Sequence, residues 1–330
     1  MGKSRFAVLV AAILFSASTL AADNPPLRIG WVYALANAPA IVAEKEGFYQ
    51  QEGLNVELKS FGDGPVITQA LAAHELDAAY IGAPPVFQWY SRGLQGQIIA
   101  KVNSGQAALL VDKNSAIASL ADLKGKRIAG VKKGSGMDVL LRGLVLSQQA
   151  KLTADKDVEV LSMPAGNMAA ALQQNVVDAA FTWEPFISEA VLRGEARILL
   201  DVNQVQPDYP WYVIMALPET LKNRPDDVLK LLRAHQKAVT FINQHPDEAN
   251  KIIAAAFKLQ AIKTADGKTI APEAVVQEAR KRIHWSVSLT GQDSAFIQRL
   301  MKDSLSLGYM QQAPRLNDVV NPDWLHKAGL

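Results

Sequence analysis

The sequence predicts an α/β fold of two lobes, each a mostly parallel sheet flanked by helices, with two chain crossings between the lobes. The main observation is an internal repeat: the segment 77–80 (Asp-Ala-Ala-Tyr) returns about 100 residues later as 178–181 (Asp-Ala-Ala-Phe). An Ala-Leu pair precedes each copy at the same spacing, and a proline follows each one. Each copy therefore predicts a helix, a polar turn, a short apolar strand and the start of a new helix. This order is typical of a parallel sheet. Two copies a domain-length apart indicate two similar lobes.

Apolar stretches bounded by turn residues mark the elements of the first lobe. Strands are expected over 27–32, 77–81, 97–102 and 107–111, and one further strand is expected to end at residue 58. Helices begin where the sequence offers start signals: Pro39 lies in a first turn, where a missing N–H costs least, and Asp63 is a suitable N-cap. Further helices are expected over 66–73 and 84–92. The alternation of strand and helix predicts a parallel sheet.

The pattern restarts at Ser119 with a capped short helix, a glycine stop and a strand that ends at Gly130. Further strands are expected over 158–162, 179–183 and 198–201, and helices from 137 to 149 and over 166–174. These elements predict a second sheet with flanking helices.

One more strand is expected over 209–216, after which the chain is nearly all helical. Helices are expected over 225–243, 246–257, 272–283 and 291–307. A helical tail without strands of its own usually packs on an existing sheet, so the tail is expected to return to the first lobe. This predicts lobe I from 27–112 plus 207–330, lobe II from 113–206, and a hinge at two crossings near Asp112 and Pro207.

Residues 1–22 have the order of a secretory signal peptide: Lys3 and Arg5, an apolar run over 6–15, and small residues up to Ala22. The run is too short to span a bilayer, which takes roughly 20 apolar residues. Cleavage is expected after Ala21 or Ala22. No cysteine follows the run, so no lipid anchor is expected, and the mature chain is expected to be soluble in the periplasm.

The composition excludes several classes of function. Lys plus Arg number 34 against 32 Asp plus Glu, without a basic run, so neither nucleic acid nor a charged membrane surface is an expected partner. No stretch after the leader is apolar enough for membrane insertion. Cysteine is absent, no histidine pair has metal-ligand spacing within one helix, and no Gly-x-Ser-x-Gly elbow occurs. We therefore expect no enzyme, no metal and no cofactor.

The candidate site follows from the sheet topology. In open parallel sheets, ligands bind beyond the carboxyl ends of the strands, at the N-termini of the next helices. This rule brings the turns at 62–64, 82–84, 134–137 and 182–184 to a shared site. Helix N-termini offer unpaired N–H groups and about half a positive charge, so they can hold an anion without an arginine. Glycine allows close backbone approach, and Ser135 adds a hydroxyl donor.

In their order and spacing, these segments resemble the periplasmic solute-binding proteins of taurine, alkanesulfonate and nitrate ABC importers. The resemblance rests on the first strand with Tyr33, 61–65 leading to 70–71, 82–85, 120–126, 133–135, 183–185 and Tyr212. It covers nearly the whole mature chain. It implies a type II periplasmic binding protein that closes around one small anion and presents it to the membrane subunits of an ABC importer. A monomer is the simplest match to a carrier of a single ligand.

The predicted ligand-binding residues come from the strand-end turns and from aromatic side chains suited to an organic group. They are Tyr33, Asn37, Asp63, Gly64, Gly82, Ala83, Pro84, Gly134, Ser135, Gly136, Met137, Trp183, Glu184, Trp211 and Tyr212. The sequence leaves open whether Glu184 pairs with a cationic group of the ligand or bridges the cleft.

The ligand class implied by the resemblance is a small organosulfur anion. Taurine-binding members carry an aspartate suited to the ligand's ammonium, where this chain has Pro210, Trp211 and Tyr212. We therefore favour an alkanesulfonate, an aromatic sulfonate or a sulfate ester over taurine. Nitrate, a carboxylate or a pyrimidine is the alternative within the class. A sensory ligand-binding domain or an enzyme on the same fold is the alternative outside it, although the related thiamine-pyrimidine synthases use a cysteine-rich motif that is absent here.

Overall fold

Each copy of the internal repeat pairs its aspartate with an arginine on the neighbouring strand. In this computed structural model, which describes residues 25–264 and 266–330, Asp77 accepts hydrogen bonds from the backbone N–H, Nε and Nη2 of Arg28 at 2.7–3.0 Å. Asp178 accepts the same three bonds from Arg127 at 2.8–3.1 Å. The repeat found in the sequence is therefore confirmed, because both copies fix the same strand pairing.

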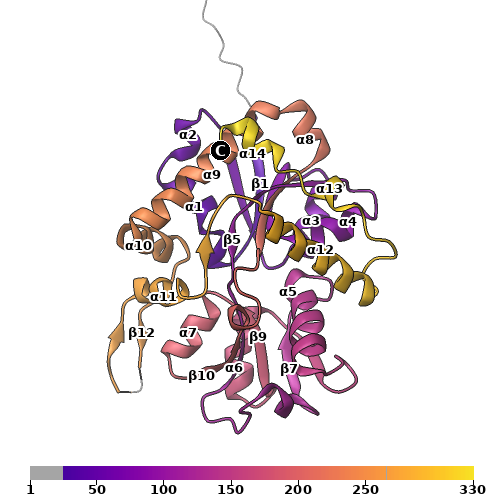
Figure 1. Cartoon of the computed structure of the whole chain (residues 1–330). Helices are drawn as coiled ribbons and strands as arrows, with labels where there is room; N and C mark the ends of the chain where they lie inside the picture. The colour runs from indigo at the N-terminus through magenta and orange to yellow at the C-terminus, as the bar shows by residue number, and fades with distance from the viewer. Residues whose placement is uncertain (1–24, 265) are drawn as a thin grey trace, which may run out of the picture.

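The strands form two five-stranded sheets with one shared plan (Figure 1). The first sheet contains, in spatial order, β2 (Val56–Phe61), β1 (Leu27–Val32), β3 (Ala78–Gly82), β11 (Tyr212–Ala216) and β4 (Gln97–Lys101). The second contains β8 (Glu159–Ser162), β7 (Arg127–Gly130), β9 (Ala179–Trp183), β6 (Ala107–Asp112) and β10 (Ala196–Asp201). In each sheet one strand, β11 or β6, runs antiparallel to both neighbours, and the other four run the same way. The predicted fold class, with two mostly parallel sheets, is confirmed.

The strand β6 corrects one detail of the predicted lobes. The sequence placed residues 107–112 in lobe I, whereas β6 pairs with β9 and β10 of the second sheet. A buried apolar strand carries no local signal for the sheet that it joins, because membership depends on its partners. We therefore propose a first crossing near Gly105, and keep the proposed second crossing near Pro207.

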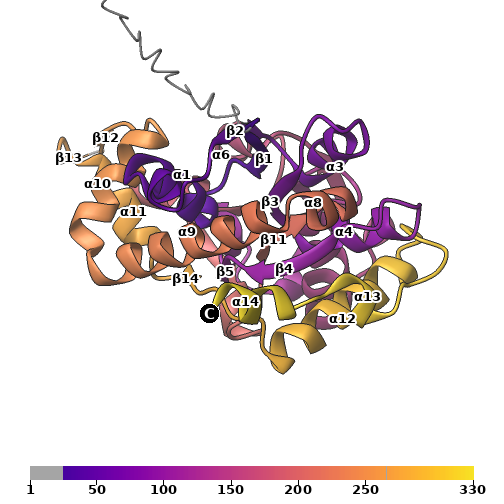
Figure 2. The same cartoon turned by 90° about the horizontal axis from the view of Figure 1, so that it is seen from above.

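Helices cover both faces of the first sheet. Figure 1 shows α1, α9 and α10 on one side and α3, α4 and α12 on the other, and Figure 2 shows the same lobe from above. The helical elements of this part are η1 (Leu35–Asn37), α1 (Ala38–Lys45), α2 (Phe48–Gln51), α3 (Gly64–Ala72) and α4 (Ala83–Tyr90). Those of the second sheet are η2 (Leu120–Leu123), α5 (Gly136–Val139), the π-helix η3 (Leu140–Ala150), η4 (Ala165–Asn167), α6 (Met168–Gln173), α7 (Phe186–Leu192) and η5 (Val202–Gln204).

The tail after β11 is mostly helical, as predicted. It comprises α8 (Pro218–Asn223), α9 (Pro225–Gln244), α10 (Pro246–Ala256), α11 (Pro272–Ala279), α12 (Gly291–Ser306), α13 (Leu316–Val319) and α14 (Asp323–Ala328). Proline starts four of these helices, α8 to α11, from the N1 or N2 position, and a Thr290–Asp293 capping box starts α12. Glu52 ties α9 to the first lobe by accepting ion pairs from Arg233 and Lys237 at 2.7 and 2.6 Å.

The tail also contains short strands that the sequence did not predict. The strands β12 (Ile262–Lys263) and β13 (Thr269–Ile270) form a hairpin, and β14 (His284–Trp285) pairs with β5 (Asn103–Ser104). Two-residue strands are too short to show a periodicity in sequence. The predicted signal peptide lies outside the described residues. None of the helices in the described part of the chain has the length and apolarity needed to cross a bilayer.

A neutral histidine lies in the core of the first lobe. His235 is fully buried; its Nδ1 accepts from the Tyr80 hydroxyl at 3.3 Å, and its Nε2 donates to the Lys101 carbonyl at 3.1 Å. Burial lowers the pKa of His235 to about 4, so the ring is uncharged at neutral pH.

Replacing His235 with Gln should flatten the pH dependence of stability between about pH 6.5 and pH 4. Below about pH 6.5 the unfolded chain binds a proton at this position that the folded chain excludes, so the wild type loses up to about 3 kcal/mol over this window. Glutamine can make both hydrogen bonds without titrating. Urea unfolding across this pH range measures the effect. The exposed control His326→Gln should keep the wild-type slope, and a wild-type slope in H235Q would contradict the account.

Candidate functional site

The loops that follow the parallel strands of both sheets meet in one cleft, as the topological rule predicts. A cavity of about 460 Å³, here called the outer cavity, lies between them and falls in the size range of small-molecule sites. Its lining residues are Tyr33, Gly62, Asp63, Val131, Lys132, Ser162, Met163, Pro164, Ala165, Gly166, Trp183 and Phe186.

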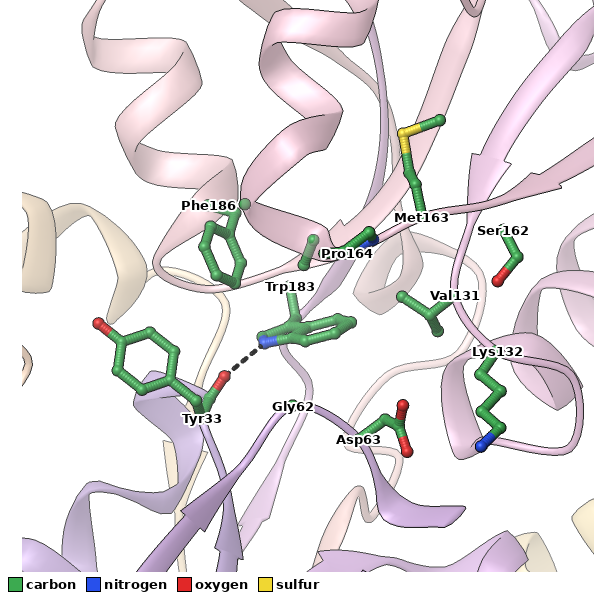
Figure 3. A pocket seen from close by; sticks show the side chains of 12 residues that line it. Tyr33, Gly62, Asp63, Val131, Lys132, Ser162, Met163, Pro164, Trp183 and Phe186 are labelled. Carbon is green, nitrogen blue, oxygen red and sulfur yellow. Dashed lines mark hydrogen bonds between the residues drawn. The ribbon is translucent and has the colours of Figure 1, made fainter. Parts of the chain in front are cut away.

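Three aromatic side chains form one wall of the outer cavity. Figure 3 shows Trp183 next to Tyr33 and Phe186, and the ring centroids of Trp183 and Phe186 are 5.8 Å apart in an edge-to-face arrangement. The indole Nε1 of Trp183 donates to the Tyr33 carbonyl at 3.0 Å. Because this bond fixes the indole, Trp183 offers its ring surface, and not its N–H, to the cavity.

Two charged side chains, one from each sheet, lie on the other side of Trp183 (Figure 3). Asp63 follows β2 in the first sheet, and Lys132 follows β7 in the second. Lys132 is exposed and forms no ion pair within the described residues. The outer cavity therefore combines an aromatic wall with one carboxylate and one ammonium.

A second, inner cavity of about 20 Å³ shares Asp63, Val131 and Trp183 with the outer one. Its other lining residues are Val32, Gly64, Gly82, Pro85, Ser135, Gly136, Met137, Trp211 and Tyr212. The two lobes nearly touch here: a Cβ on Gly136 would lie 3.2 Å from Trp211 and 3.5 Å from Pro84. The volume is that of about one water molecule.

The turn that begins α5 is held by a carboxylate from its own helix. Asp138 accepts hydrogen bonds from the Gly134 N–H at 3.1 Å, from Arg142 Nε at 2.6 Å and from the hydroxyl of Tyr309. Ser135 Oγ accepts from the Asp138 N–H at 3.2 Å, which leaves its own proton free to be donated. Tyr309 belongs to the tail, so this contact also connects the two sides of the cleft.

Other helix N-termini at the cleft are likewise capped by the protein. Asp63 Oδ1 accepts from the Val66 N–H at the start of α3, and Glu184 Oε2 accepts from the Ser188 N–H in the first turn of α7, both at 3.0 Å. The start of α4 contains the pair 84–85, two prolines that have no N–H. The expectation of several free helix N-termini is therefore not met, because carboxylates and prolines already occupy most of them.

Ten of the fifteen predicted ligand-binding residues line the two cavities. They are Tyr33, Asp63, Gly64, Gly82, Ser135, Gly136, Met137, Trp183, Trp211 and Tyr212. The five that line neither are Asn37, Ala83, Pro84, Gly134 and Glu184. Asn37 is fully buried and donates to the Val32 carbonyl at 2.8 Å, so its role is to support the loop after β1.

Glu184 bridges the cleft. It is fully buried, and its Oε1 lies 2.5 Å from Nε of Arg282, which follows α11 in the tail. Its carbonyl also accepts from the Leu35 N–H at 2.9 Å. Arg282 Nη2 donates to Ser188 Oγ at 3.1 Å, which completes a buried polar cluster. Of the two alternatives for Glu184, the geometry favours the bridge.

Several lining residues were missed by the sequence interpretation. They are Val32, Pro85, Val131, Lys132, Ser162, Met163, Pro164, Ala165, Gly166 and Phe186, whereas Gly62 lies in one of the predicted turns. The segment 162–166 begins at the last residue of β8, which pairs in parallel with β7. The strand-end rule applied to the other turns would have found it, since the carboxyl ends of parallel strands lie at one sheet edge.

The comparisons with known proteins agree with this geometry. A profile of the NMT1-like family matches residues 20–257. A putative binding protein of Brucella abortus (strain 2308) is 30% identical over 288 residues, which cover 85% of this chain and 88% of that protein. A putative aliphatic sulfonates-binding protein of Bacillus subtilis (strain 168) is 31% identical over 229 residues, 68% of this chain and 67% of that protein.

Among solved structures, the alkanesulfonate-binding protein SsuA from Xanthomonas axonopodis pv. citri bound to MOPS has the same fold. Its TM-score is 0.76 at 22% identity, over 90% of this chain and 98% of that chain.

Replacing Arg282 with Met should destabilise the protein by about 3 to 5 kcal/mol, because the substitution leaves the Glu184 carboxylate buried without its partner. Urea unfolding at neutral pH measures the loss. The control Arg315→Met removes an ion pair with Asp318 that lies on the surface, and it should leave the unfolding midpoint nearly unchanged. Equal effects of the two substitutions would show that the buried bridge does not stabilise the fold.

Proposed function

The chain belongs to the NMT1-like family, and on that premise we propose that it is a solute-binding protein that holds one small organosulfur anion in its cleft and delivers it to an ABC importer. The observation that carries the proposal is the outer cavity, which joins an aromatic wall to polar groups from both lobes. The sulfonate-binding relative, which aligns with two thirds of this chain, supports the ligand class.

The proposed ligand is an aromatic or bulky aliphatic sulfonate or a sulfate ester. A volume of about 460 Å³ and the wall of Tyr33, Trp183 and Phe186 suit an organic group larger than that of taurine. Asp208 is the nearest acidic residue to Trp211 in sequence. It is exposed, and its Oδ1 lies 3.6 Å from Nδ1 of His284. That position supports a ligand without an ammonium group at this end of the cleft.

The anionic group of the ligand would be bound by a few hydrogen-bond donors that the fold holds in position. Gly136 and Met137 start α5 with N–H groups that have no acceptor within the described residues, and Ser135 has a free hydroxyl proton. Lys132 adds one positive charge at the same end of β7. An anion can therefore accept hydrogen bonds from neutral N–H and O–H donors and from one charged ammonium group. We expect such a mixture of neutral and charged donors in a carrier that must also release its ligand.

Closure around the ligand would follow from contacts made by both lobes. The outer cavity takes Tyr33 and Asp63 from the first lobe and Lys132, Trp183 and Phe186 from the second. A ligand that touches both sides stabilises the closed form relative to an open one, with the proposed hinge near 105 and 207. Secretion through the proposed leader, residues 1–22, would bring a monomeric carrier to the periplasm.

A thermal-shift screen of the mature protein tests this function. The panel contains aromatic sulfonates, sulfate esters, alkanesulfonates, taurine, nitrate and simple carboxylates. A ligand at about 100 times its Kd should add about 2.7 kcal/mol and raise the midpoint by a few degrees. A shift confined to organosulfur anions is the expected result. A shift with nitrate or a carboxylate alone would contradict the ligand class, and no shift with any compound would contradict the proposed function.

Replacing Trp183 with Ala should weaken binding of an aromatic sulfonate about tenfold or more, because the substitution removes the central ring of the wall. Isothermal titration measures the affinity. The control Trp89→Ala removes a half-buried indole at the far end of α4 that lines neither cavity, and it should leave the affinity unchanged. Unchanged affinity in W183A would show that the aromatic wall is not part of the binding site.

A further inference from the structure

One buried carboxylate joins the turn with the proposed anion donors to the tail of the chain. Asp138 is 1% exposed, and it accepts hydrogen bonds from the Gly134 N–H, from Arg142 Nε and from the hydroxyl of Tyr309. Gly134 and Arg142 lie at the same end of the second lobe as Asp138. Tyr309 lies 171 residues away along the chain, in the turn after α12. The bond from Tyr309 therefore crosses between two distant parts of the chain.

Tyr309 is anchored to the first lobe. Arg92, which follows α4, donates from Nη2 to the Tyr309 carbonyl at 3.2 Å. Gln88 Nε2 in α4 lies 3.4 Å from Ser304 Oγ in α12, to which it donates. Because α4 follows β3 of the first sheet, these contacts fix α12 and the turn after it to that sheet. The hydroxyl of Tyr309 thus reaches from the first lobe to a carboxylate of the second.

The helix α12 also packs closely on the second lobe. Figure 1 shows α12 beside α5, and α12 contacts the helix η3 as well. Gln148 Nε2 in η3 donates to Asp303 Oδ1 in α12 at 3.3 Å. A Cβ on Gly143 would lie 2.9 Å from the carboxyl carbon of Asp303, a distance that real Cβ atoms do not adopt. The absence of a side chain at residue 143 therefore allows the approach that brings Tyr309 to Asp138.

We propose that Tyr309 is a positioning residue that holds the two lobes together on a bound anion. Its hydroxyl donates to Asp138 when the lobes are closed, and this bond keeps the donors of the turn 134–137 against the ligand. Tyr309 lines neither cavity, so it acts on the ligand through Asp138. This inference rests on the proposed function, because it needs an anion at this turn.

The position of the bond determines which step of binding it affects. A hydrogen bond to a charged carboxylate is stronger than one between neutral groups. Because Tyr309 and Asp138 belong to opposite lobes, the bond contributes to the closed form and is lost when the lobes part. Ligand enters and leaves through the open form. Removal of the bond is therefore expected to speed dissociation and to leave association nearly unchanged.

Tyr309→Phe tests the proposal, since it removes the hydroxyl and keeps the ring. Stopped-flow tryptophan fluorescence measures both rate constants, with the organosulfur anion that gives the largest thermal shift as the probe. Y309F should release this anion about tenfold faster than the wild type and bind it at a rate within twofold. The matched control Tyr49→Phe removes a hydroxyl that donates to the Ala40 carbonyl at 3.1 Å within the first lobe, and both rate constants should stay at wild-type values.

A distance measurement separates closure from folding stability. The sequence has no cysteine, so Lys222→Cys on α8 and Gln174→Cys after α6, both at exposed positions, accept one spin label on each lobe. With saturating ligand, the wild type should show the closed-form distance alone, and Y309F should retain part of the ligand-free distribution. A role in folding stability alone would lower the unfolding temperature of Y309F and leave its distances equal to those of the wild type.

The outcomes separate this inference from the proposed function. Wild-type release in Y309F, or equal acceleration in Y49F, would overturn the role of Tyr309 and leave the carrier function intact. If Y309F fails to fold, Gly143→Ala takes its place, because a methyl group there pushes α12 away from η3 and should speed release in the same way. Failure of the wild type to bind any anion of the panel would overturn both.

Discussion

The direction of two strands determines where everything else in the cleft lies. β6 and β11 follow the two crossings, and each runs antiparallel to its neighbours, so each starts at the carboxyl edge of the parallel strands. Ala107 is thus paired with Trp183, and Tyr212 with Gly82. The crossings and the strand-end loops consequently share one edge in both sheets. The proposed hinge and the proposed binding site therefore lie at the same edge, where a ligand would contact the groups whose movement closes the lobes.

The cleft balances its charges locally before any ligand binds. Asp63, Asp138 and Glu184 cap the helices that face it, and Glu184 is itself paired with Arg282. The positive ends of these helices are therefore already compensated, and an incoming anion meets a small number of N–H and O–H donors near one exposed lysine. In the proposed function, the aromatic wall next to them selects for a ligand with an organic group. Such a site selects by shape and hydrogen bonding more than by net charge.

Much of the fold could be predicted from the sequence, because strand and helix signals are local. The repeat at Asp77 and Asp178 predicted two similar sheets, and the family resemblance is confirmed by the match over residues 20–257. The sheet that β6 joins could not be predicted, because it depends on pairing with distant strands. Within the site, the strand-end rule found Trp183 and the search for aromatic side chains found Tyr212, but neither could show that Gly134 is bonded to Asp138. Side-chain partners of this kind arise only when the chain is folded.

A crystal structure of the mature protein with its preferred aromatic sulfonate tests the central claim most directly. We expect the organic group to lie against Trp183 in the outer cavity, with the sulfonate near Ser135 and Gly136. A ligand bound on the outer surface of either lobe, or one in the cleft with its sulfonate turned away from α5, would contradict it.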